Sequence, residues 1–479
     1  MSEDDPKNQL LRVDHGRLAV LAKTDNRIIS EMVESSINLA KDLIIKNDLD
    51  SLFEEGNRFY NQAFYEKAVS LYERAAFLGH SASQNALGYC YAKGLGVPKQ
   101  YEKAFSLYYQ ASQGNNSIAQ HNLGCLYWNG EAVSKNEVKA FKWILRSAKN
   151  GFSKAQFDTG RFFWNGYGGN EIDRKEALKW YCLAAQNNNI DAILELARIY
   201  EKAPGFDHVP EEAFQWYLKA AELLSPLAQY CVATCYLDGY GVTKNDDEAV
   251  KWLLCAAQQQ PIGFSCAQHA LGHCYKDARG VKHDLEMAVH WYQKAAEQGL
   301  IVAQYDLAGL YVRGVGIAID YKKSASWYGK AAEQGHAISQ YNFGYCFESG
   351  SGVEKDYVKA VYWYGKAAEQ GLQCAQLNLG SCYFYGDGVP KDYIVAIKWY
   401  QKSADQGYDR AQYQLGRCYQ KGTGVKPDIF QAYRWYKLSA DQGYKKAIEE
   451  IAALTELMSL SELNAAQALC LEINTPPSK

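Results

Sequence analysis

The sequence repeats itself at a nearly constant interval, and this periodicity limits the possible folds more than any other feature. The nonapeptide WYGKAAEQG begins at Trp327 and again at Trp363, 36 residues later. A related position, at which a helix is expected to open, recurs along most of the chain in steps of 36 or 37 residues, with one step of 39. These positions are Ser83, Ala119, Ala155, Ala192, Ala228, Ala267, Ala303, Ser339, Ala375, Ala411 and Ala447. A period of about 20 to 50 residues indicates a repeat architecture in which similar units stack on one another.

One unit, AQLNLGSCYFYGDGVPKDYIVAIKWYQKSADQG, shows what is repeated. Its first stretch, helix A, has residues of one stripe at helical spacing: Ala375, Leu379, Cys382 and Tyr383. Its second stretch, helix B, has another stripe, which comprises Ala396, Trp399, Tyr400, Ser403 and Ala404. The segment GDGVPKD separates the two helices, and Gly407 is suited to end the second. Two such short helices cannot bury their apolar faces alone, so every unit must present the same packing surface to the next.

The pattern AQxxLGxxYxxGxGVxKD followed by AxxWYxKAAEQG resembles the Sel1-like repeat family, a relative of the tetratricopeptide repeat. About ten units in register carry the resemblance, from Ser81 to Lys446. The resemblance implies an all-α fold, a right-handed α/α superhelical solenoid whose A helices line the concave face. It also implies a role in binding proteins.

The periodicity divides the chain into four segments. Residues 1–50 are expected to form an N-terminal helical cap and leader, and residues 51–80 resemble a shorter tetratricopeptide-type helical pair. The Sel1-like repeats occupy residues 81–446, and residues 447–479 are expected to form capping helices and a short tail.

Composition and charge narrow the class of protein. A formal net charge of -3 gives no overall attraction to nucleic acid or to anionic membranes, and the lysines of helix B have acidic neighbours. The N-terminus lacks the features of a secretory signal, and no run approaches 18 apolar residues, so we expect a cytoplasmic protein that is not inserted in a membrane. Most of the 13 cysteines occur singly, several at one repeated position of helix A, which indicates buried free thiols.

The second to fifth repeats, whose helix-opening alanines are Ala119, Ala155, Ala192 and Ala228, depart most from the common pattern, and this predicts a binding surface. By similarity to tetratricopeptide geometry, offsets +2, +3, +6 and +9 from the helix-opening alanine should face the concave groove. In the diverged units these offsets carry Trp128, Asp158, Arg161, Trp164, Glu195, Arg198 and Glu201. Tryptophan and arginine are the residue types that anchor protein interfaces. Two alternatives stay open: each tryptophan packs against an adjacent loop, and the loop changes reflect drift in a tolerant fold.

Motifs for catalysis or cofactor binding are weak. The recurring GxG follows a helix rather than a strand and lacks a third glycine, so it predicts a turn and not a phosphate loop. The segment CAQHALGHC places Cys266, His269 and His273 on one helical face, where they could bind zinc with Asp306 of the next repeat as a fourth ligand. Accidental placement is the competing interpretation, and we predict no cofactor and no catalytic residues.

These observations favour a non-catalytic scaffold or adaptor, monomeric, that binds a protein or an extended peptide. The family resemblance also allows a bacterial effector that is delivered into a host cell and engages a host protein by the same groove. A metal-dependent enzyme using CAQHALGHC and a purely architectural solenoid are the remaining alternatives.

Overall fold

The computed structural model describes residues 35, 48–202 and 208–473, with side chains as far as residue 468. Within these residues every regular element is an α-helix. The predicted leader, residues 1–50, lies almost wholly outside them. The chain divides into two compact units, Met1–Phe206 and Asp207–Lys479, which are described separately.

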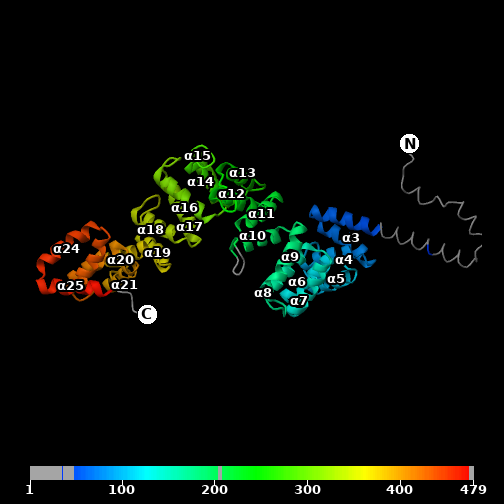
Figure 1. The fold of residues 1–479 in the computed structure, drawn as a ribbon, viewed down its shortest axis with the longest axis horizontal. Helices are drawn as coiled ribbons and strands as arrows, with labels where there is room; N and C mark the ends of the chain where they lie inside the picture. Colours follow the sequence, from blue (N-terminus) through cyan, green and yellow to red (C-terminus); the bar gives the residue numbers. More distant parts are fainter. Residues whose placement is uncertain (1–34, 36–47, 203–207, 474–479) are drawn as a thin grey trace, which may run out of the picture. The chain divides into compact units, whose positions relative to one another are not determined.

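In each unit, helices that follow one another in the sequence pack side by side as antiparallel hairpins (Figure 1). The first unit begins with a helical segment at 48–61, and its further helices are α3 (Tyr65–Phe77), α4 (Ser81–Lys93), α5 (Tyr101–Gln113), α6 (Ser117–Asn129), α7 (Glu137–Lys149), α8 (Ser153–Asn165), α9 (Arg174–Gln186) and α10 (Ile190–Lys202). The helices of the second unit are α11 (Pro210–Glu222), α12 (Pro226–Asp238), α13 (Asp246–Ala257), α14 (Ser265–Asp277), α15 (Leu285–Glu297), α16 (Ile301–Arg313), α17 (Tyr321–Glu333), α18 (Ala337–Ser349), α19 (Tyr357–Glu369), α20 (Gln373–Tyr385), α21 (Tyr393–Asp405), α22 (Asp409–Lys421), α23 (Ile429–Asp441), α24 (Lys445–Leu457) and α25 (Leu460–Ile473). From α4 to α23, the even-numbered helices are A helices and the odd-numbered helices are B helices.

The GxGVxKD segment is the turn between helices A and B, as the sequence predicts. Gly350 ends α18 in the left-handed conformation, with φ 76°. Gly352, also at positive φ, lies so close to the preceding repeat that a Cβ there would be 1.9 Å from the carbonyl oxygen of Tyr321. The carboxylate of Asp356 then accepts hydrogen bonds from the amides of Val358 and Lys359, both 3.0 Å long, and so caps α19. The motif therefore ends one helix, contacts the previous hairpin and starts the next helix.

The LG pair of helix A and the WY pair of helix B fit together within each hairpin. Gly380 of α20 lies under the ring of Tyr400 of α21, and a Cβ at Gly380 would be 2.7 Å from that ring. Tyr400 is fully buried as a result. Gly344 and Tyr364 make the same contact one repeat earlier. The glycine is thus needed for close approach of the two helices.

A ladder of glutamines, in which the AQ residue of each pair is buried, joins one repeat to the next. The AQ glutamine of α20, Gln376, donates to the carbonyl of Ala368 in the preceding B helix at 3.2 Å. The same side chain accepts a 2.8 Å hydrogen bond from Gln406, the EQG-type residue of its own B helix. Equivalent pairs recur 30 residues apart, for example between Gln442 and Gln412. The conspicuous AQ and EQG motifs are therefore two halves of one hydrogen-bond network.

The apolar core continues to the end of the described chain. Helices α24 and α25 cover the last repeat, where Leu454, Met458 and Ala466 pack with Tyr413 and Tyr436. The cysteines of the repeated helix-A position are free and buried, as predicted, and they are Cys90, Cys274, Cys346, Cys382 and Cys418. Among the described helices, none is both long and apolar enough to cross a membrane.

Candidate functional site

The A helices of the first unit are linked side chain to side chain. Position +2 of one repeat contacts position +3 of the next: Asn122 of α6 reaches Asn85 of α4 at 3.0 Å, and Nε2 of His121 lies 2.8 Å from a carboxylate oxygen of Asp158 on α8. These contacts bring offsets +2 and +3 of neighbouring A helices together. We use the name A-helix face for the predicted residues of α6, α8 and α10.

Asp158 is held by two cationic groups. His121 contacts one oxygen, and a guanidinium nitrogen of Arg161 lies 3.5 Å from the other. Burial lowers the pKa of His121, but its hydrogen bonds to Asp158 and to Cys125 outweigh burial and raise the pKa to about 9. Arg161 itself is 57% exposed, so its guanidinium remains accessible to a ligand.

Trp128 is half-buried rather than free. Its ring packs at 5.1 Å from Phe162 and at 5.3 Å from Tyr167, and Lys135 lies over it at 5.2 Å. Tyr167 belongs to the loop between α8 and α9. Trp128 therefore packs against an adjacent loop, as one of the two alternatives proposed. One part of the indole nevertheless stays accessible.

Trp164 is also half-buried, within its own hairpin. Its ring lies 6.3 Å from Tyr181 of α9, and the guanidinium of Arg174 lies 5.4 Å from its centre. Such ring and cation contacts fix the orientation of an indole without covering it completely.

Helix α10 adds a further set of charges. A guanidinium nitrogen of Arg198 lies 3.2 Å from the carboxylate of Glu195, and Arg198 is 66% exposed. Glu201 pairs with Lys202 at 3.5 Å. Burial and the nearby carboxylate of Glu195 raise the pKa of Tyr181, which connects α10 electrostatically to α8 and α9.

Two residues that contact the A-helix face, His121 and Tyr167, were not predicted from the sequence. His121 occupies offset +2, so the same offset rule could have found it. Tyr167 lies in a loop, where no periodicity applies, and its contact with Trp128 could not have been predicted from spacing.

A second group of polar side chains lies in the second unit. Nε2 of His269 and Nε2 of His273, both on α14, lie 2.7 Å and 3.7 Å from the same oxygen of Asp306 on α16. One ligand atom from each residue lies within 4.8 Å of the others. Burial, followed by the charges of His269 and Lys276, lowers the pKa of His273. Cys266 lies outside this group, so the structure brings together two of the three predicted ligands and the proposed fourth.

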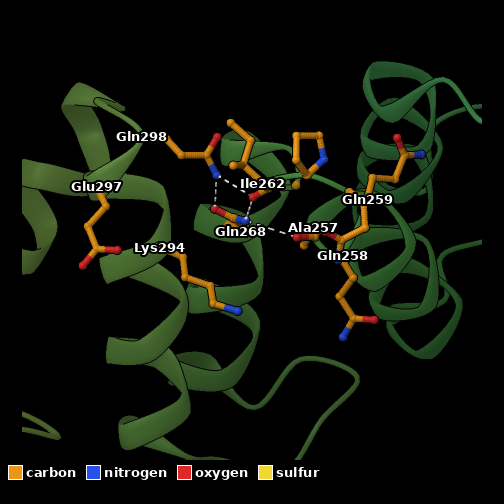
Figure 2. Close-up of a pocket in the computed structure, with 11 residues that line it drawn as sticks. Ala257, Gln258, Gln259, Ile262, Gln268, Lys294, Glu297 and Gln298 are labelled. Atoms are coloured by element: carbon orange, nitrogen blue, oxygen red, sulfur yellow. Dashed lines mark hydrogen bonds between the residues drawn. The ribbon is translucent and has the colours of Figure 1, made fainter. Parts of the chain in front are cut away.

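The inserted segment between α13 and α14 shapes a pocket of about 830 Å³. Figure 2 shows that the insertion joins the glutamine ladder, because the carbonyl of Ile262 accepts from Gln268 at 2.9 Å and from Gln298 at 3.0 Å. Lys294 and Glu297 line the pocket from α15 (Figure 2). The insertion therefore keeps the hydrogen bonds of the ladder while it opens a polar hollow.

The consecutive hairpins, the shared glutamine ladder and the linked A helices define an α-solenoid. The Sel1 repeat model matches residues 65–80, 81–116, 117–152, 153–189, 190–223, 226–261, 267–300, 301–336, 337–372, 375–408 and 409–444. The chain therefore belongs to the Sel1 repeat family, and the expected family and fold class are confirmed.

Solved structures agree with this assignment. The chain is 32% identical to a protective antigen present in uropathogenic Escherichia coli strains that displays an SLR fold, with a TM-score of 0.64, over 91% of this chain and 93% of that chain. It is 28% identical to a Sel1 repeat protein from Oxalobacter formigenes, with a TM-score of 0.55, over 70% of this chain and 93% of that chain. Among curated proteins, none matches the chain.

Proposed function

We propose that this Sel1 repeat protein is a non-catalytic scaffold that binds a protein or an extended peptide on the A-helix face of residues 117–202. One observation carries the proposal: consecutive A helices present half-buried tryptophans together with exposed arginines. Trp128 and Trp164 would be the aromatic anchors, with Arg161 and Arg198 beside them. Such residues dominate the binding energy of many interfaces.

The surroundings of these side chains favour binding at low entropic cost. Phe162 and Tyr181 support the two indoles, and the carboxylates of Asp158 and Glu195 hold the guanidiniums in position. A side chain that is already ordered loses little rotamer freedom when a partner arrives. The arginines would donate to carboxylate or carbonyl oxygens of the partner.

A second candidate is a bacterial effector that engages a host protein by the same face after delivery into a host cell. The 32% identity to a protective antigen of a pathogenic bacterium favours it. Both candidates use the same residues and differ in where the partner is found.

The test compares partners recovered from bacterial and host-cell lysates by the wild type and by a variant with Trp128→Ala, Trp164→Ala and Arg198→Ala. A matched control carries Tyr321→Ala, Tyr362→Ala and Lys366→Ala, which change two exposed aromatic residues and one exposed cation on B helices of the second unit. We expect a partner that is lost only with the first variant. Equal recovery by all three proteins, with unchanged circular dichroism, would contradict the proposal.

A further inference from the structure

The histidine pair of α14 and the carboxylate of α16 are arranged as the ligand set of a metal ion. Zinc lies about 2.0–2.2 Å from histidine nitrogen and carboxylate oxygen, so ligand atoms around one tetrahedral ion are about 3.3 Å apart. The two distances to Asp306, 2.7 Å from His269 and 3.7 Å from His273, bracket that value. The ligand atoms of the two histidines also lie within 4.8 Å of each other, so all three ligands would have to turn toward a common centre to bind an ion.

A buried hydroxyl beside the cluster lacks a partner, which is an independent indication. Tyr292 is 1% exposed and its hydroxyl makes no hydrogen bond among the described residues. In two later repeats the equivalent hydroxyl is satisfied by the A helix, since Tyr436 donates to Gln420 at 2.8 Å and Tyr364 donates to Glu348. Burying an unpaired hydroxyl is unfavourable, so the hydroxyl of Tyr292 points to a hydrogen-bond partner that the protein side chains do not supply.

The unpaired hydroxyl belongs to a ring that lies against both imidazoles. The ring of Tyr292 is 5.3 Å from that of His269 and 5.3 Å from that of His273. A water bound to an ion between the histidines and Asp306 would be a suitable partner for the hydroxyl.

A similar cluster in the first unit shows what distinguishes the site. His121 and Asp158 occupy the same repeat positions as His269 and Asp306, but there Arg161, three residues after the aspartate, pairs with the carboxylate. Three residues after Asp306 the chain has Gly309. Within the described chain the ion-pair partners of Asp306 are the two histidines alone, so its negative charge is available to a cation.

We propose that His269, His273 and Asp306 bind one divalent transition-metal ion of the zinc class, with Tyr292 donating a hydrogen bond to a water on that ion. Two imidazoles and one carboxylate are ordinary ligands for such ions and leave a coordination position for water. Because the ligands come from α14 and α16, the ion joins two successive repeats and stabilises the second unit. This inference does not depend on the proposed partner-binding face.

The positive charge of Lys276 should weaken metal binding. Its ammonium is 3.4 Å from Nδ1 of His273, which must carry a proton when Nε2 binds metal. The same ammonium lies 3.8 Å from a carboxylate oxygen of Asp277, so it can turn toward that residue. Replacement of Lys276 by glutamine should therefore strengthen metal binding.

The experiment titrates the chelator-treated full-length protein with zinc by calorimetry and with cobalt by absorption spectroscopy. We expect one saturable site for which cobalt shows no thiolate charge-transfer band, since the ligands are nitrogen and oxygen. His273→Gln and Asp306→Asn should each weaken binding at least about tenfold, whereas His290→Gln, an exposed histidine on α15, should leave it unchanged. Absence of saturable binding, a thiolate band from the bound cobalt, or equal affinity in all variants would overturn the proposal.

Tyr292→Phe tests whether the Tyr292 hydroxyl contributes to metal binding or only to the packing of the fold. The variant should weaken metal binding by about tenfold, while the metal-free protein should be no less stable than the wild type because an unpaired buried hydroxyl has been removed. Unchanged metal affinity, or a loss of stability without metal, would contradict the assigned role of this hydroxyl.

Discussion

The side-chain amide of Gln406 donates a 2.8 Å hydrogen bond to Gln376, which donates in turn to the carbonyl of Ala368 in the preceding repeat. Gln376 is only 4% exposed. We expect Gln376→Leu to remove both hydrogen bonds and, at about 0.5–1.5 kcal/mol for each, to reduce local stability by about 1–3 kcal/mol. Hydrogen exchange of the amides in residues 337–408 would measure this loss. As a control, Lys398→Ala changes an exposed side chain of α21 and should have an effect within about 0.5 kcal/mol.

Two helix-interior glycines should respond oppositely to alanine. At Gly380 a Cβ would lie 2.7 Å from the buried ring of Tyr400, so Gly380→Ala should destabilise the hairpin by about 1–3 kcal/mol. At Gly365 a Cβ would meet no atom within 4 Å, so Gly365→Ala should stabilise α19 by up to about 1 kcal/mol. Urea unfolding of both variants tests this pair, and a change of the same sign in both would contradict the packing described.

The contact between His121 and Asp158 predicts a dependence of stability on pH. The folded-state pKa of His121, about 9, lies above the ordinary value of about 6.5. The contact therefore stabilises the fold fully below about pH 6.5, and its contribution, at most about 3 kcal/mol, is lost as the pH rises through about 9. Urea unfolding should show a larger difference between the wild type and Asp158→Asn at about pH 6 than at about pH 9.5. A difference independent of pH would show that His121 is not charged in the folded protein.

The cysteines should differ sharply in reactivity. Burial raises the pKa of the Cys346 thiol to about 11 and that of Cys382 to about 12, so neither should react with a thiol reagent at neutral pH until the chain unfolds. Cys255 is exposed and should react first. In a Cys470→Ser background, which removes a cysteine whose side chain is outside the described set, the fast phase should disappear with Cys255→Ser. A fast phase that persists would show that Cys255 is not the most reactive thiol of the described chain.

The hairpins could be predicted from the sequence because each is determined by residues that lie close together within one unit. The glycines of the turn, the capping aspartate and the helix-A thiols are all encoded at fixed offsets within one unit, so reading a unit such as that from Ala375 suffices. The glutamine ladder was not predicted, because Gln376 and Gln406 are 30 residues apart and nothing in their spacing shows that they meet.

The candidate sites were predicted only in part. The offsets placed Asp158 and Arg161 on a common surface, but not the packing of Trp128 against Tyr167, because that contact depends on the path of an irregular loop. The CAQHALGHC motif identified the two histidines of α14, whereas Cys266 lies outside their group and the buried hydroxyl of Tyr292 became visible only in the structure.

Site-specific photocrosslinking would show whether the A-helix face of residues 117–202 binds the partner. A benzophenone amino acid at position 161, where Arg161 is 57% exposed, would be compared with one at Val358, which is 65% exposed on the B helix α19. We expect a covalent adduct with the recovered partner from position 161 and none from position 358. An adduct from position 358 alone would contradict it.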